Sequence, residues 1–144
     1  MKILHCGSID VKTGGPALST SLSMRGVVPF GVNPEIWQEP LRSGGKYVTD
    51  DFVIHSQKTT PLCDIKDVDI YHIQGIWMEQ NHEMAKYARK VNKPYVITLR
   101  GMLYPQALNG NSSFKKKIAM FLYQRKDLQR AACVQATCVE EKDL

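Results

Sequence analysis

Short apolar runs alternate with longer segments of helical periodicity along most of the 144-residue chain. Short runs rich in β-branched and aromatic residues are typical of strands. They predict strands at 2–6, 35–38, 52–55, within 67–77, at 95–99 and at 132–136, and the helical spacing predicts helices at 16–26, 78–91, 114–130 and from 139 onward. Strands that alternate with helices favour right-handed βαβ units. We therefore expect one α/β domain over residues 1–144, with a parallel sheet flanked by helices on both faces.

The stretch 67–77 contains the strand around which we arrange the other predicted elements. Apart from His72, its apolar run is continuous, which is typical of a parallel strand covered on both faces. Ligands of such sheets collect at the carboxyl ends of the strands, near the point where the strand order reverses. We therefore expect Gln74 and Gly75, with His72, to lie at the rim of a binding crevice.

The expected helices each have a recognisable pattern. Pro16 suits the first turn of a helix, where its missing N–H costs nothing, and Leu18 and Leu22 share a face of that helix. The helix at 78–91 is expected to turn four residues inward, Met84, Ala85, Ala88 and Val91. The helix at 114–130 is expected to carry an apolar stripe made of Phe114, Ile118, Phe121, Leu122 and Leu128.

Composition narrows the class of protein. The chain is 43% hydrophobic, enough for one domain with a core, and it contains neither a signal-like start nor an apolar run of about 18 residues that could span a bilayer. We therefore expect a cytoplasmic protein. The four cysteines, Cys6, Cys63, Cys133 and Cys138, form no Cys-x-x-Cys pair and are interpreted as buried thiols.

Charge is distributed unevenly along the chain. The net charge is +5, and eleven of the 19 Lys and Arg residues lie between Lys86 and Arg130, where Asp127 is the one acid. That part carries +10 and the remainder −5. Such an asymmetry favours an anionic partner, although solvated helix faces explain most of the count.

Two short motifs have candidate chemistry. Gly14-Gly15-Pro16 lies between a strand and a helix, where backbone N–H groups and the positive helix end can hold an anion, but a tight turn explains it equally well. Asp67-Val-Asp69 has the spacing of a metal motif, yet it precedes its strand and is explained by turn formation. No other set of ligand residues has metal spacing, so we expect no metal and no cofactor.

Four segments in order, Gly14–Pro16, Asp69–Gly75, Thr98–Pro105 and Tyr123–Ala131, resemble the N-terminal domain of family 4 glycosyltransferases. These are retaining enzymes with two Rossmann-like domains, the GT-B type. The resemblance covers nearly the whole chain and implies transfer of a sugar from a nucleotide-sugar donor to a hydroxyl of a glycan or lipid-linked acceptor. It implies that the chain is the acceptor-side half of such an enzyme.

The resemblance also assigns residues. It places Gly14 and Gly15 near donor phosphates or the acceptor, together with Gly75 and Gly101 at strand exits. It gives His72 and Gln74 the catalytic positions, although many members have His where this chain has Gln74. Arg100 replaces another family histidine, and a bidentate donor at a strand exit suits phosphate or carboxylate. The alternative interpretation of His72 is a hydrogen-bonded core histidine.

Relatives continue into a second domain that grips the nucleotide sugar, so we expect the 144 residues alone to be inactive and to self-associate through uncovered apolar surface. Lys115, Lys116 and Lys117 are candidates for contact with the inner face of an anionic membrane. The alternative function is a non-catalytic Rossmann-like module that binds an anionic ligand or a membrane surface. A nucleic acid is the less favoured partner.

Overall fold

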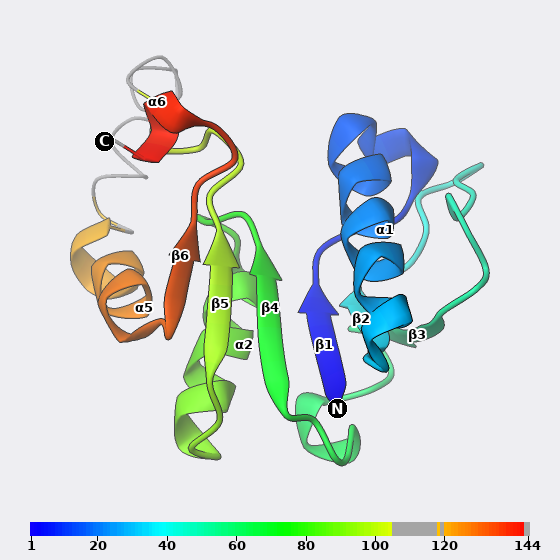
Figure 1. The fold of residues 1–144 in the computed structure, drawn as a ribbon, viewed down its shortest axis with the longest axis horizontal. Helices are drawn as coiled ribbons and strands as arrows, with labels where there is room; N and C mark the ends of the chain where they lie inside the picture. The colour runs from blue at the N-terminus through cyan, green and yellow to red at the C-terminus, as the bar shows by residue number, and fades with distance from the viewer. Residues whose placement is uncertain (105–117, 119, 143–144) are drawn as a thin grey trace. The chain divides into compact units, whose positions relative to one another are not determined.

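The computed structural model describes residues 1–104, 118 and 120–142. Six strands belong to one sheet in the order β3-β2-β1-β4-β5-β6, flanked by helices (Figure 1). The strand pairs β1 with β2, β2 with β3 and β5 with β6 are all parallel, which confirms the expected α/β class. Residue contacts gather into two compact units, Met1–Tyr71 and His72–Leu144, and each unit is described below by itself.

The first unit contains three complete strands and the first long helix. These are β1 (Lys2–Cys6), α1 (Gly15–Val27), β2 (Asn33–Gln38) and β3 (Val53–Ser56), with short 3-10 turns at Val11–Thr13, Val28–Phe30 and Leu62–Asp64. Helix α1 begins with Pro16 in its first turn, as expected, and it follows a glycine that has a left-handed φ of 74°. Each predicted strand of this unit is present within two residues of its expected bounds.

The second unit begins inside β4 (Ile70–Gln74) and continues through α2 (Glu79–Lys90) and β5 (Tyr95–Thr98). A π-helical turn at Met120–Gln124 leads into α5 (Arg125–Arg130), which is followed by β6 (Cys133–Gln135) and α6 (Val139–Lys142). Met78 and Val91 flank α2 as its two cap residues. The part of the predicted helix 114–130 that precedes residue 118 lies outside the described residues.

Buried faces agree with the predicted periodicity in α2 and differ from it elsewhere. Helix α2 buries Met84, Ala85 and Ala88 as expected, but Val91, expected inside, is 37% exposed because it lies beyond the last helical turn. Helix α1 buries four small or flexible residues, Ala17, Thr20, Ser21 and Met24. Small side chains at these positions let the helix approach the sheet closely.

The expected apolar stripe is wrong at two of its described members, Ile118 and Leu122, whereas Leu128 is partly buried. Ile118 is 42% exposed and Leu122 is 68% exposed, while the buried positions of this segment are Gln124 and Asp127. A π-helical turn changes the angular spacing of the side chains, so a stripe spaced for an α-helix no longer faces one direction. Polar side chains therefore enter the interior here and need hydrogen-bond partners.

Three of the four cysteines also differ from expectation. Cys6 is buried in β1, but Cys63, Cys133 and Cys138 are exposed free thiols. Cys133 belongs to β6, whose three residues are all exposed, so a strand-like sequence did not imply burial there. None of the helices in the described part of the chain is both long and apolar enough to cross a bilayer.

Candidate functional site

A chain of hydrogen bonds joins the carboxyl ends of three strands in the second unit. Arg100, just past β5, donates through Nε to Gln74 Oε1 at 3.0 Å, and Gln74 lies at the end of β4. The amide nitrogen of Gln74 is 3.4 Å from His72 Nδ1, and His72 Nε2 is 2.8 Å from Thr98 Oγ1. The Thr98 hydroxyl donates onward to Gln135 Oε1 on β6 at 2.9 Å.

This arrangement determines the protonation of His72. The single hydroxyl proton of Thr98 is given to Gln135, so Thr98 can only accept from the imidazole, which places the His72 proton on Nε2. Nδ1 is then the acceptor of the ring, and the Gln74 amide nitrogen lies 3.4 Å from Nδ1 and 3.3 Å from Nε2. Burial, and secondly the positive charge of Arg100, lower the pKa of His72 to about 4. His72 is therefore neutral at physiological pH and positions Gln74.

Arg100 is held in an unusual conformation. Its φ is 56°, in the left-handed region that an arginine rarely adopts, and burial lowers the pKa of its guanidinium. Gln74 is a neutral acceptor, so it orients the guanidinium without cancelling its charge. Strained backbone that surrounding structure maintains is concentrated at functional sites. The position therefore combines a fixed orientation with positive charge.

Two glycines shape the exits of β4 and β5. Gly75 has φ of 94°, donates its N–H to Thr98 O at 2.7 Å, and lies so close to Met102 that an added Cβ would be 2.9 Å from Met102 Cε. Gly101 has φ of 72° next to Arg100. Trp77, with φ of 75°, donates from its indole Nε1 to Met102 O at 3.2 Å. The two exit loops are thus tied to each other.

Glu141 anchors the loop after β5. It is 2% exposed, it accepts from the backbone N–H of Gly101, and its second oxygen accepts from Thr137 N and Oγ1 at 2.7 and 2.8 Å. Burial works against ionisation of Glu141, yet the hydrogen bonds from Thr137 and Gly101 lower its pKa below the ordinary value. Glu141, Thr98 and Gln135 were not predicted as site residues, because their roles depend on contacts distant in sequence.

Gly14 and Gly15 belong to the first unit. Both are exposed, and a Cβ added to either would meet no atom within 4 Å. Pro16 has no N–H, and the N–H groups of Ala17 and Leu18 both donate to Gly14 O, at 3.0 and 3.4 Å. The start of α1 therefore has less capacity to bind a phosphate through backbone amides than the sequence suggested, and the open space beside Gly15 is its clearest feature.

The other predicted motifs have simple structural roles or lie outside the described residues. Asp67 has a left-handed φ of 58°, as turn residues do, and Asp69 accepts from the backbone N–H of Lys2 in β1 at 2.8 Å. Within the described part of the chain, no group of three or more His, Cys, Asp or Glu side chains could hold a metal ion. Lys115, Lys116 and Lys117 fall outside the described residues.

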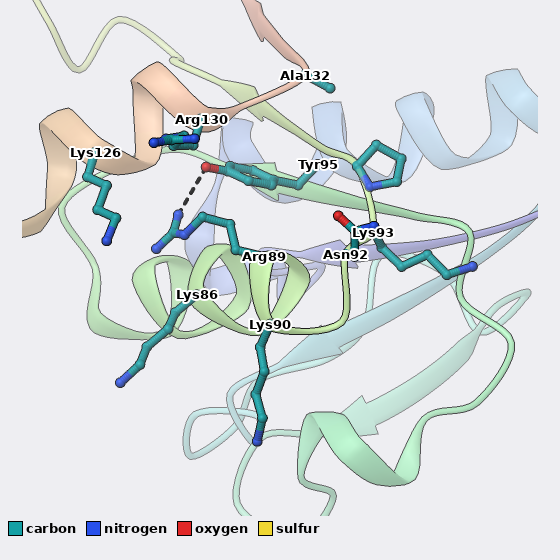
Figure 2. Close-up of a pocket in the computed structure, with 10 residues that line it drawn as sticks. Lys86, Arg89, Lys90, Asn92, Lys93, Tyr95, Lys126, Arg130 and Ala132 are labelled. Carbon is teal, nitrogen blue, oxygen red and sulfur yellow. Dashed lines mark hydrogen bonds between the residues drawn. The ribbon is translucent and has the colours of Figure 1, made fainter.

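Much of the basic character of the second unit surrounds one cavity of about 680 Å³ where β5 begins (Figure 2). Its lining consists of residues from α2, the following turn, β5 and α5, namely Lys86, Arg89, Lys90, Asn92, Lys93, Pro94, Tyr95, Lys126, Arg130 and Ala132. The cavity lies at the opposite end of β5 from Arg100. It is therefore separate from the hydrogen-bonded strand ends described above.

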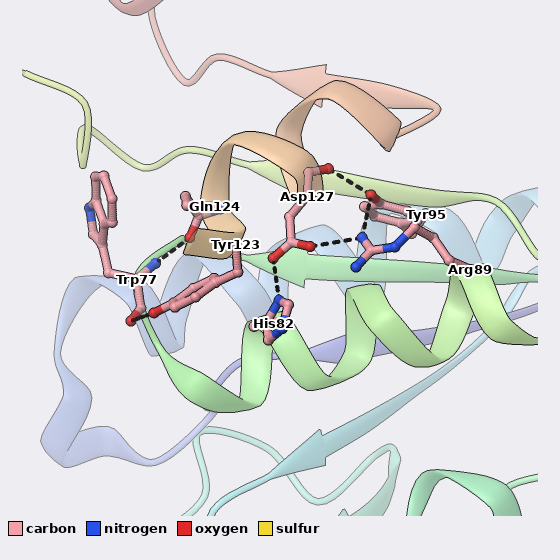
Figure 3. A network of polar contacts seen from close by, with 7 residues as sticks. All are labelled: Trp77, His82, Arg89, Tyr95, Tyr123, Gln124 and Asp127. Carbon is pink, nitrogen blue, oxygen red and sulfur yellow. Dashed lines mark hydrogen bonds and ion pairs between the residues drawn. The ribbon is translucent and has the colours of Figure 1, made fainter. Parts of the chain in front are cut away.

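A buried carboxylate supports this basic region (Figure 3). Asp127 on α5 is 1% exposed and accepts from His82 Nδ1 and Arg89 Nη1 on α2, both at 2.7 Å. Its backbone carbonyl accepts from the Tyr95 hydroxyl at 2.6 Å. These contacts hold α5 against α2 and β5. They also give the buried Asp127 side chain the hydrogen-bond partners that it needs.

Comparison with known proteins adds no assignment. No protein-family model matches the chain, and a search of curated proteins finds no match either.

Proposed function

We propose that the chain is the N-terminal, acceptor-side domain of a retaining glycosyltransferase similar to family 4, which moves a sugar from a nucleotide donor to an acceptor hydroxyl. The observation that carries the proposal is Arg100, a partly buried guanidinium in a left-handed conformation at the end of β5, oriented by Gln74 at the end of β4. Ligands of parallel α/β sheets bind at this edge.

The residues of this edge have distinct roles in the proposal. Arg100 binds a phosphate or carboxylate of the acceptor or stabilises negative charge as the donor phosphate departs, and Gln74 orients it. Gly75 and Gly101 provide the left-handed backbone of the two exit turns, and Gly75 leaves room for Met102. His72 stays neutral and fixes the amide of Gln74, so it acts as a positioning residue. Most of the rate enhancement would come from holding donor and acceptor together.

Activity of the protein encoded by the complete reading frame tests the proposal. Release of nucleotide from a panel of nucleotide sugars is measured for the wild type, for Arg100→Gln and for Arg125→Gln, an exposed arginine of α5 that serves as the matched control. We expect Arg100→Gln to lower kcat/KM by at least about tenfold, since a charge-assisted contact contributes about 1.5–3 kcal/mol. The control should retain wild-type activity.

Two results would contradict the proposal. Equal activity of Arg100→Gln and the control would show that Arg100 contacts neither substrate nor the departing phosphate. A reading frame without a second nucleotide-binding domain, combined with no nucleotide release from any donor, would leave a non-catalytic Rossmann-like module as the better account.

A further inference from the structure

The cavity at the start of β5 has a one-sided charge. Six of its ten lining residues are lysine or arginine, and none is an acid. The acid nearest in sequence to the lining residues of α5, Asp127, is 1% exposed, and both of its carboxylate oxygens are occupied by His82 and Arg89. Asp127 therefore offsets the charge of Arg89 and forms no ion pair with the other five cations of the lining.

Most of these cations are available to a ligand. Lys86, Lys90, Lys126 and Arg130 form no ion pair with any residue that the structure describes. Arg89 has a different task, because it is fixed by Asp127, by the Tyr95 hydroxyl at 3.0 Å and by its position 5.8 Å over the Tyr95 ring. The site thus combines a fixed floor, made of Arg89 and Tyr95, with long side chains that can reorient toward an anion.

Figure 2 shows how the side chains are arranged around this floor. Arg130 of α5 and Arg89 of α2 lie beside the hydroxyl end of Tyr95, and Lys126 lies further away along α5. Lys86, Lys90 and Lys93 extend outward from α2 and the turn after it. The charges are spread over two helices and a turn, so a single small anion cannot contact all of them at once.

We propose that this cavity binds a ligand that carries two or more linked phosphate groups. A volume of about 680 Å³ lies within the range of small-molecule sites, and several separated cations match several negative charges better than one. The inference does not rest on the proposed glycosyltransferase function, because the cavity and Arg100 lie at opposite ends of β5.

Two competing ligand classes fit less well. Single-stranded nucleic acid is bound through bases stacked on exposed aromatic rings, but the one aromatic residue of the lining, Tyr95, is 2% exposed. Proteins that bind a membrane surface usually insert large apolar side chains that lie beside basic ones. Besides Tyr95, the apolar residues of this lining are Pro94 and Ala132, which are both small. The phosphates themselves are therefore the recognised feature.

Calorimetric titration of the full 144-residue chain with tripolyphosphate, pyrophosphate and orthophosphate tests the proposal. We expect affinity to increase with the number of linked phosphates and to weaken with added salt. The double variant Lys126→Gln, Arg130→Gln should lose at least about tenfold in tripolyphosphate affinity. The control variant Arg125→Gln, Lys142→Gln removes the same charge from exposed positions outside the lining and should lose less than about twofold.

Cations near helix ends also stabilise the helices, so the thermal midpoint of every variant is measured separately. If the α5 variant is unfolded, Lys86→Gln, Lys90→Gln replaces it with the same expected loss. Equal losses in the cavity and control variants, or equal affinity for orthophosphate and tripolyphosphate, would overturn the proposal. So would binding to phosphatidylglycerol vesicles that depends on Lys126 and Arg130 in a protein that does not bind tripolyphosphate.

Discussion

The lowered pKa of the partly buried His72 imidazole gives the protein a specific pH response. The folded pKa of His72 is lowered to about 4 from an ordinary value of 6.5, so between these values the unfolded chain binds more protons than the folded one. Stability contributed by the neutral imidazole is present above pH 6.5 and is lost as the pH falls toward 4. We therefore expect the wild type to lose unfolding free energy in this window.

Urea denaturation of wild type and His72→Gln across this pH range measures the effect. Carboxylates titrate in both proteins, so their contribution cancels in the difference between the two free energies. The advantage of the wild type over the variant should shrink as the pH decreases from 6.5 to 4. A difference that is independent of pH would show that the folded imidazole titrates normally.

Neighbouring glycines at the start of α1 are expected to respond differently to substitution. Gly14 has φ of 74° and ψ of −137°, a conformation that is strained for a residue with a side chain, so Gly14→Ala should lower the unfolding free energy by about 1–2 kcal/mol.

Gly15 has open space beside it and no positive φ, so Gly15→Val should leave the thermal midpoint nearly unchanged. If the proposed transferase activity is present and a substrate approaches this loop, Gly15→Val should lower that activity. Normal activity together with a large loss of stability would assign Gly15 to the turn alone.

At the scale of elements, one carboxylate holds α5 in place. Asp127 accepts one hydrogen bond on each carboxylate oxygen, and replacement by Asn turns one of these oxygens into an amide NH2 that faces a donor. Asp127→Asn should lower the unfolding free energy by roughly 2–3 kcal/mol, below the full cost of breaking a buried pair because His82 and Arg89 are partly exposed. Chemical denaturation measures this, with the exposed Asp50→Asn as the control. Similar stability of the two variants would mean that packing alone positions α5.

Helix α1 presents an apolar face to solvent. Leu18 and Leu22 are more than half exposed, one turn apart, and Val11 is exposed on the preceding 3-10 turn. Contiguous exposed apolar side chains promote association. Sedimentation velocity should therefore show concentration-dependent self-association that weakens in Leu18→Gln, Leu22→Gln and persists in Val139→Gln, which removes an exposed apolar side chain elsewhere. A wild type that is monomeric at every concentration would contradict this.

At the scale of the whole molecule, the proposed function requires a second domain that binds the nucleotide. Titration of the 144-residue chain with nucleotide sugars should accordingly show affinity no better than about millimolar, near −4 kcal/mol. Transfer should be absent, because positioning both substrates contributes roughly 7–11 kcal/mol to catalysis and the proposal assigns the donor to the second domain. Micromolar binding of a nucleotide sugar, or turnover by this chain, would place the donor site among these residues.

The amino-acid sequence by itself determined the class of fold. Strands within the first 104 residues match their expected ranges closely, because β-branched runs and their Gly and Pro boundaries are local properties. Pro16 at the start of α1 and the buried face of α2 were predictable for the same reason. The edge that carries Gln74, Gly75, Arg100 and Gly101 followed from the rule that parallel strands end together.

Only the tertiary structure decided how that edge is built. Thr98, Gln135 and Glu141 take part through partners 26 to 40 residues away, which no local pattern encodes. The burial of Gln124 and Asp127 in place of Leu122 likewise depends on a π-helical turn and on His82 and Arg89 of α2, which contact the carboxylate. The excess of lysine and arginine between residues 86 and 130 was visible in the sequence. These side chains surround one cavity only because folding brings α2 and α5 together at the start of β5.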